Sequence, residues 1–173
     1  MVEQLILVDE NDNQIGSMEK LETHKKGLLH RAFSGFIFND KKELLLQQRA
    51  SCKYHNPNIW SNTVCSHPNV DETTYNAIKR RIFEEFGFDS DFKEVGTLTY
   101  KIEFKNGLTE NEFDHIFVAK YNNQVINPNK NEIQNYKWIN KQDLEKEITK
   151  NPENYSYWLR QILKMNNLFN EYF

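Results

Sequence analysis

The alternation of hydrophobic and polar positions predicts short strands in the first part of the chain. Residues 4–8 form an apolar run followed by Asp and Asn residues, so we expect a strand, a turn and a second strand over residues 14–18. Residues 31–38 alternate and carry three phenylalanines, and residues 43–48 follow a polar turn, which predicts a hairpin. Residues 19–30 are polar and predict a short helical turn and a loop.

Apolar residues at helical spacing predict the main helix over residues 71–87. The residues expected on its buried face are Tyr75, Ile78, Ile82 and Phe86. Asp71 suits the N-cap, Glu72 suits the first turn, and Gly87 stands where a C-terminal cap is expected.

The second half of the chain mixes strands and helices. An Asn-Gly turn joins two expected strands over residues 96–104 and 109–119. A short strand over residues 136–139 precedes an expected helix over residues 141–148, and a last helix is expected over residues 154–169. The apolar residues expected near one face of that last helix are Tyr157, Trp158, Ile162 and Leu163.

The length of the chain fits one domain of ordinary size, residues 1–173. The chain has 173 residues and a net charge of −3, without the basic stripe that nucleic-acid binding requires. No apolar run is long enough to cross a bilayer, and the N-terminus has an acid where a signal peptide needs positive charge. We therefore expect a cytosolic protein in which Cys52 and Cys65 are free thiols.

Two groups of residues indicate a reactive site. Cys65 and His67 are one residue apart, so an extended chain directs both side chains to the same face. Glu110 and Glu112 likewise share one face of a strand, where paired like charges favour a bound cation. Other polar residues are ambiguous from the sequence. His24 and His30 are each compatible with solvated surface, and so is the basic loop that contains Arg49, Lys53, Tyr54 and His55.

The helix and its flanks resemble the Nudix box. The matching residues are Glu72, Arg80, Ile82, Glu84, Glu85, Gly87 and Phe88. Ser66 replaces the opening Gly of the pattern, and Arg81 replaces the first Glu of its core. Together with further motifs, these departures make the chain similar to type I isopentenyl-diphosphate Δ-isomerases. The motifs are residues 62–68, Glu110-Asn111-Glu112, and the tail from Asn129 through Glu132 and Ile133 to Tyr136.

The resemblance implies an α/β (α+β) Nudix fold, in which a mixed sheet lies between helices. It implies conversion of isopentenyl diphosphate to dimethylallyl diphosphate, and the reverse, by a monomer or weak homodimer. The implied ligands of a first divalent metal, Mn²⁺ or Zn²⁺, are His24, His30, His67, Glu110 and Glu112. Glu85, with the Cys65 carbonyl nearby, is implied to help hold a Mg²⁺ ion on the diphosphate.

The resemblance also assigns the remaining site residues. Cys65 and Glu112, assisted by Tyr100, correspond to the groups that move protons, and Trp158 corresponds to an aromatic residue beside the reacting carbons. The implied diphosphate-binding residues are Lys20, Arg49, Lys53, Ser66 and Arg81. From the residues alone, Arg81 and Glu85 are equally compatible with an intrahelical ion pair, and Trp158 with a plain core position.

Two other functions compete with the isomerase. A Nudix pyrophosphohydrolase acting on a nucleoside or other diphosphate would need an acid at position 81, although Glu84 favours it slightly. A catalytically silent binding module would not need Cys65 or Glu112. Cys52, His55 and His115 are expected to lie at the surface or around the site without a direct role.

Overall fold

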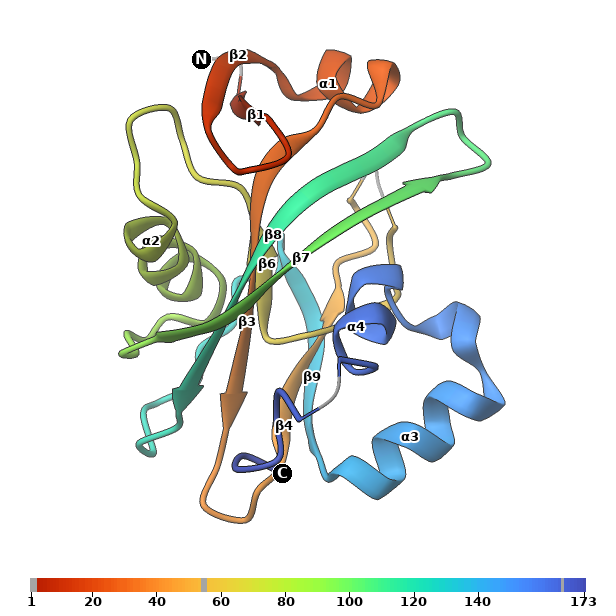
Figure 1. Ribbon diagram of the computed structural model, residues 1–173. Helices are drawn as coiled ribbons and strands as arrows, with labels where there is room; N and C mark the ends of the chain where they lie inside the picture. The colour runs from red at the N-terminus through yellow and green to blue at the C-terminus, as the bar shows by residue number, and fades with distance from the viewer. Residues whose placement is uncertain (1–2, 54–55, 166) are drawn as a thin grey trace.

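The computed structural model describes residues 3–53, 56–165 and 167–173. Tyr54 and His55 of the basic loop therefore lie outside the described residues. Nine strands form one mixed sheet organised around β3 (His30–Phe38). Figure 1 shows that this sheet is curled. The strands that pair with β3 are β1 (Gln4–Val8), β4 (Leu44–Arg49), β6 (Val64–Ser66) and β8 (Thr109–Lys120). Among the described strand pairs, only β3 and β8 run parallel.

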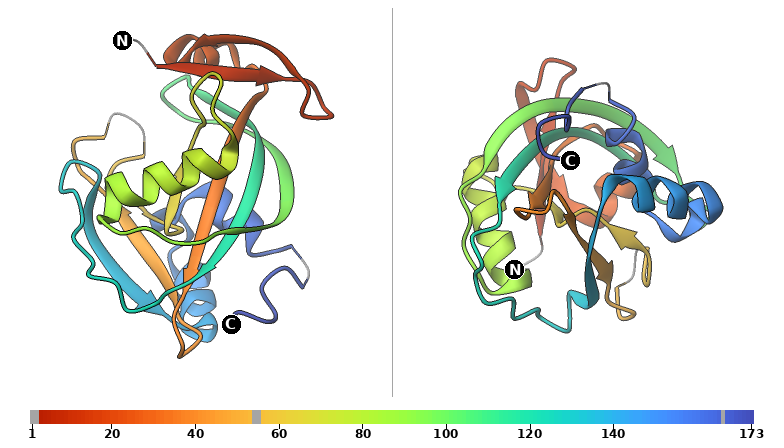
Figure 2. Two further views of the ribbon diagram at one scale, coloured as in Figure 1. Left: turned by 90° about the vertical axis from the view of Figure 1, so that its left-hand side faces the viewer. Right: turned by 90° about the horizontal axis from the view of Figure 1, so that it is seen from below.

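The other strands extend this sheet and the helices flank it. The outer strands are β2 (Gln14–Glu19), β5 (Trp60–Ser61), β7 (Lys93–Glu103) and β9 (Ile133–Ile139). The helices are α1 (Lys20–Lys26), α2 (Thr74–Phe86), α3 (Lys141–Lys150), the 3₁₀ helix η1 (Pro152–Asn154) and α4 (Tyr157–Ile162). Figure 2 shows α2 on one side of the curled sheet and α3 with α4 on the other, which confirms the expected Nudix layering.

The period of two along β3 divides the core into two layers. Phe33 and Ile37 pack with α2, whereas Phe36 and Phe38 pack in the cluster that includes α3, α4 and the C-terminal segment. Successive strand residues point to opposite faces, so a strand buried on both sides is apolar almost throughout. This explains why the alternating aromatic run in the sequence becomes the centre of the fold.

The predicted strands are confirmed, with small shifts at their ends. The main helix is also confirmed, but it begins later than expected, and Asp71 is not its N-cap. The side-chain oxygen of Thr73 accepts a hydrogen bond from the Asn76 amide, while Asp71 has φ = 68° in the preceding turn. Tyr75, in the first turn of α2, is 39% exposed, so the prediction that it is buried is wrong. Gly87 caps the helix at φ = 77°, as expected.

The predicted long last helix, residues 154–169, is wrong, because among its described residues only Tyr157–Ile162 is α-helical. The Ser156 amide donates to the Trp60 carbonyl at 2.8 Å, which fixes the chain in an extended form just before α4. After α4 the chain turns back, with Asn167 at φ = 67°, and the ring of Phe169 packs 4.7 Å from that of Phe36. Within the part of the chain that the structure describes, no helix is long and apolar enough to cross a membrane.

Gly35 provides a test of the packing between β3 and α2. A Cβ atom at this position would lie 2.7 Å from both Ile78 Cδ1 and Val64 Cγ1. We predict that Gly35→Ala lowers the free energy of unfolding by about 1–3 kcal/mol, because the core must be overpacked. Urea denaturation would measure this loss. Gly16→Ala is the matched control, because a Cβ there meets nothing within 4 Å. Equal stability of the two variants would contradict the packing described here.

Candidate active site

One cavity of about 100 Å³ opens between α1, α2, α4 and the strands around β3. All the predicted site residues line this cavity except His30, which is fully buried beside it. The predicted residues that line it are Lys20, His24, Arg49, Lys53, Cys65, Ser66, His67, Arg81, Glu85, Tyr100, Glu110, Glu112 and Trp158. Segments far apart in the sequence therefore meet at one site.

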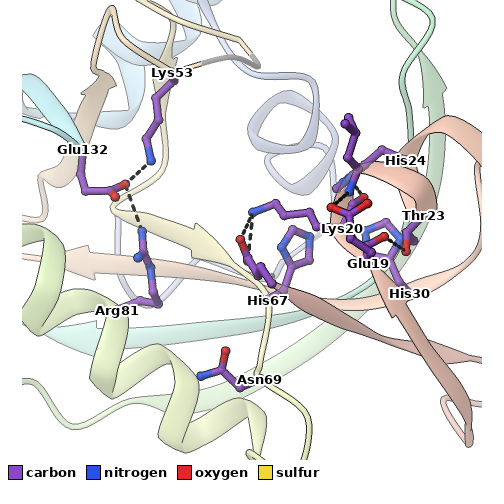
Figure 3. Close-up of polar contacts among 12 residues, drawn as sticks. Glu19, Lys20, Thr23, His24, His30, Lys53, His67, Asn69, Arg81 and Glu132 are labelled. Atoms are coloured by element: carbon purple, nitrogen blue, oxygen red, sulfur yellow. Dashed lines mark hydrogen bonds and ion pairs between the residues drawn. The ribbon is translucent and has the colours of Figure 1, made fainter. Parts of the chain in front are cut away.

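Three histidines and two glutamates form a compact cluster at one end of the cavity. The cluster is His24, His30, His67, Glu110 and Glu112, and one ligand atom from each lies within 4.8 Å of all the others. The imidazole rings are 5.0–5.9 Å apart, centre to centre. Part of this arrangement, around His24, His30 and His67, is drawn in Figure 3.

Hydrogen bonds from the Nδ1 atoms of His24 and His30 direct the Nε2 atoms of these two residues into the cluster, whereas His67 Nδ1 has no hydrogen-bond partner among the described residues. His24 Nδ1 donates to the Lys20 carbonyl at 2.7 Å, and His30 Nδ1 donates to the Leu28 carbonyl at 2.9 Å. His30 Nε2 is buried and lacks a hydrogen-bond partner among the described residues, and it lies 3.7 Å from Glu112 Oε1. Outer hydrogen bonds that fix the tautomer are typical of metal-binding histidines. The donor set therefore fits a divalent metal ion.

Strand register and short turns position these ligands. His30 of β3 is the Cα partner of Glu112 on β8, and Glu112 is in turn the partner of Tyr100 on β7. The helix α1 brings His24 over the same strands, because Asn111 of β8 donates to the Gly27 carbonyl at the end of α1. Glu110 and Glu112 share one face of β8, as the sequence predicts.

A phenol, Tyr100, and a thiol, Cys65, line the cavity together with residues of the cluster. The Tyr100 hydroxyl donates a short hydrogen bond to Glu112 Oε2. Burial, and then the charge of Glu112, raises the pKa of Tyr100, so its hydroxyl stays protonated. Burial also raises the pKa of the Cys65 thiol to about 12, although the charge of Arg49 opposes this shift. Cys65 and Glu112 reach the cavity from β6 and β8, which pair with β3 separately.

Trp158 is both a core residue and part of the cavity wall. It is 5% exposed and lines the cavity. Its indole Nε1 donates to Ser61 Oγ and to Asn62 Oδ1, both at 3.0 Å. Ser61 Oγ also lies 3.8 Å from the Cys65 sulfur, so one buried hydroxyl group contacts both the thiol and the indole.

Positive side chains and carboxylates alternate at the other end of the cavity. Arg81 Nη2 donates to Glu85 Oε1 at 2.6 Å and to Glu132 Oε2 at 3.1 Å. Arg81 and Glu85 therefore do form the intrahelical ion pair, and both also line the cavity. Burial raises the pKa of Glu85, against the effects of Arg81 and of Gln47, whose Nε2 donates to it at 2.7 Å.

Three residues of the cavity wall were not given a role from the sequence: Phe33, Gln47 and Glu132. Glu132 belongs to the tail motif, which indicated a relationship but no contact. Cys52 and Cys65 are free thiols, as expected, and Cys52 is exposed. His115 lies outside the cluster and pairs with Asp12 and Glu94.

Comparison with known proteins identifies close relatives by sequence. A family model described as the NUDIX domain matches residues 28–161. The protein named Isopentenyl-diphosphate Delta-isomerase 2 of Aromatoleum aromaticum is 43% identical over 164 residues, which cover 94% of this chain and 86% of that protein. The protein of the same name from Photorhabdus laumondii is 44% identical over 163 residues, 94% of this chain and 92% of that protein.

Solved structures share the fold at lower sequence identity. A crystal structure from Deinococcus radiodurans has a TM-score of 0.70 and 19% identity, and the match covers 86% of this chain and 90% of that one. A MutT Nudix hydrolase from Burkholderia pseudomallei has a TM-score of 0.64 and 17% identity, with 80% and 98% covered. At these identities the likeness concerns the fold and not the activity.

The histidine and glutamate cluster predicts a metal-dependent gain in stability. We expect Mn²⁺ or Zn²⁺ to raise the melting temperature of the metal-stripped protein, because an ion that binds only the folded state stabilises it. At 100 times the dissociation constant the gain is about 2.7 kcal/mol. Scanning calorimetry would measure it.

Two variants test whether this gain comes from the cluster. Glu110→Gln should abolish most of the shift, because it removes one of the charged donors of the cluster. His115→Asn should preserve the shift, because His115 lies outside the cluster although it also contacts two carboxylates. Loss of the shift in the His115 variant alone would contradict the assignment.

The two thiols should differ in reactivity. Burial raises the pKa of Cys65 to about 12, and only the thiolate is a good nucleophile. Cys52 is exposed. We expect iodoacetamide to modify Cys52 well before Cys65 in the metal-stripped protein at neutral pH, and the rate at Cys65 to rise as the pH increases. Mass spectrometry of the peptides would check this order, and faster modification of Cys65 would contradict it.

Proposed function

We infer the function from the family: this chain belongs to the Nudix-domain isopentenyl-diphosphate Delta-isomerase family. We propose that it interconverts isopentenyl and dimethylallyl diphosphate. The observation that carries this proposal is the content of the cavity. It contains a thiol, Cys65, and a phenol, Tyr100, that is hydrogen-bonded to Glu112 of the histidine and glutamate cluster, together with a group of basic side chains. A double-bond shift in a diphosphate ester needs groups that add and remove protons at the carbon end and positive charge that binds the diphosphate end.

The candidate metal-binding residues form two sets, one for each of two divalent ions. The residues that would hold Mn²⁺ or Zn²⁺ are His24, His30, His67, Glu110 and Glu112, and Glu85, near the Cys65 carbonyl, would help hold Mg²⁺. Bound in these places, the first ion would fix the orientation of Glu112, and the second would offset the charge of the diphosphate. His30 Nε2 is buried and has no hydrogen-bond partner among the described residues, which supports the first site.

The reaction moves one proton onto the substrate and removes another. In the forward direction, Glu112 with Tyr100 donates a proton to the terminal alkene carbon, which leaves a tertiary carbocation. Cys65 then accepts a proton from the carbon next to the CH₂–O group, and the electrons of that C–H bond form the new double bond. The reverse reaction begins with the protonated thiol, the form that the raised pKa of Cys65 favours, whereas the forward reaction needs the thiolate, the form that the same shift disfavours.

The walls of the cavity suit a short-lived cation. Trp158 presents an aromatic ring beside the thiol, and an indole face attracts a positive charge by about 0.5–2 kcal/mol. Exclusion of water protects the cation from hydration. The diphosphate would lie among the basic residues Lys20, Arg49, Lys53 and Arg81, which line the cavity together with Ser66. Binding of this inert end positions the reacting carbons.

The hydrolase alternative fits the site less well. Position 81 carries an arginine whose guanidinium contacts Glu84, Glu85 and Glu132. Glu84, the acid that favoured a hydrolase, has a side chain that is 42% exposed, contacts Arg80 and Arg81, and does not line the cavity. Of the two adjacent acids Glu84 and Glu85, only Glu85 therefore reaches the cavity.

An isomerisation assay tests the proposal. With Mg²⁺ and Mn²⁺ present, the protein should convert isopentenyl diphosphate to its allylic isomer without release of phosphate or pyrophosphate. Cys65→Ala and Glu112→Gln should each lower kcat by about 10²–10⁴-fold or more, because each removes a proton-transfer group. Product analysis by NMR, with circular dichroism to verify folding, would measure both.

Cys52→Ala is the matched control for the thiol, and it should retain turnover because Cys52 is exposed and outside the cavity wall. Phosphate release without an allylic product would refute the isomerase and favour the hydrolase. Near-normal turnover of Cys65→Ala would refute the role proposed for that thiol.

A further inference from the structure

Glu132 forms a bridge between two of the cations in the cavity. Its Oε2 atom accepts a short hydrogen bond from Lys53 Nζ and another, of 3.1 Å, from Arg81 Nη2, as Figure 3 shows. The carboxylate lines the cavity, and its side chain is 21% exposed. A single anionic oxygen thus lies between an ammonium group and a guanidinium group.

The backbone fixes Glu132 at this position. The Ala50 amide donates to the Glu132 carbonyl at 2.9 Å, and the Glu132 amide donates to the Asn129 carbonyl at 2.9 Å. The Asn129 amide in turn donates to the Glu85 carbonyl at 2.8 Å, at the end of α2. The segment that carries Glu132 is therefore attached both to the loop of Lys53 and to the helix of Arg81.

The same contacts are those that a phosphate oxygen would make. Ammonium and guanidinium groups are the usual partners of phosphate oxygens, and hydrogen bonds between ionised groups are the stronger ones. Burial opposes ionisation of Glu132, but Lys53 and Arg81 lower its pKa overall, so the carboxylate is charged in the absence of substrate. Two anions cannot occupy one position between these cations without strong repulsion.

We propose that Glu132 is an internal competitor of the diphosphate. In the free enzyme its carboxylate occupies the position between Lys53 and Arg81, and it must leave this position when a diphosphate oxygen binds there. The inference rests on the proposed function, because it takes Lys53 and Arg81 as the diphosphate-binding residues. It adds a residue that determines affinity for the diphosphate and does not touch the reacting carbons.

The exchange has two physical consequences. The cations are never left without a counter-charge in a partly buried site, so the empty cavity keeps its shape. The substrate also replaces an existing ion pair instead of forming a new one, which weakens its net binding and favours release of a product that carries the same diphosphate. Weaker binding of the diphosphate suits a reversible reaction whose substrate and product differ only in the position of a double bond.

Calorimetric titration with inorganic pyrophosphate, in the presence of a chelator, tests the competition separately from catalysis. Glu132→Gln should bind pyrophosphate about tenfold more tightly than the unaltered protein, because the variant removes a competing charged hydrogen bond. Glu132→Asp keeps the charge and should remain closer to the unaltered protein. In the isomerisation assay, Glu132→Gln should lower KM more than it changes kcat.

Glu84→Gln is the matched control. Glu84 contacts the other terminal nitrogen of the same guanidinium, Arg81 Nη1, at 2.9 Å, but it lies outside the cavity wall. It should leave the pyrophosphate affinity unchanged. Weaker binding by Glu132→Gln, or equally tight binding by the Glu84 variant, would overturn the competition. Failure of isomerisation together with tighter pyrophosphate binding would refute the proposed function and leave the competition intact.

Discussion

The parallel pairing of β3 with β8 is the constraint on which the candidate site depends. It sets His30 opposite Glu112 and fixes which face of β8 carries the two glutamates. A shift of one residue would turn Glu110 and Glu112 away from the histidines and would bring Asn111, with Thr109 or Phe113, in their place. The same register also divides Ile116 and Phe117 between the two core layers. Core packing and site geometry therefore depend on the same backbone hydrogen bonds.

Around this register the cavity separates two kinds of charge. At one end, two carboxylates lie among three imidazoles, with no lysine or arginine in the cluster, an arrangement that a divalent cation completes. At the other end, Arg81 and Lys53 are each paired with carboxylates, an arrangement that another anion can enter only by exchange. Cys65 and Trp158 belong to neither end, and the buried hydroxyl of Ser61 contacts both.

Much of the fold and of the site could be predicted from the sequence, because it depends on local periodicity and on recognisable motifs. The strands followed from alternation, and the same face for Glu110 and Glu112 followed from the period of two. The approach of His24 to Glu110 depends on a contact between residues 86 positions apart, which the family resemblance supplied and periodicity could not. No feature of the sequence predicted the contacts of Glu132, since only the tertiary structure brings it between Lys53 and Arg81.

The largest error of prediction lies beside the site and has a physical cause. Apolar spacing favoured one long C-terminal helix, yet α4 is a single short segment, because its start is tied to the β5 strand through Ser156 and Trp60. That attachment brings the indole of Trp158 to the buried polar groups of Ser61 and Asn62. A longer, regular helix would form more of its own backbone hydrogen bonds, but these bonds alone would not position the Trp158 ring near the thiol. Local helical preference therefore yields here to a tertiary contact that completes the cavity wall.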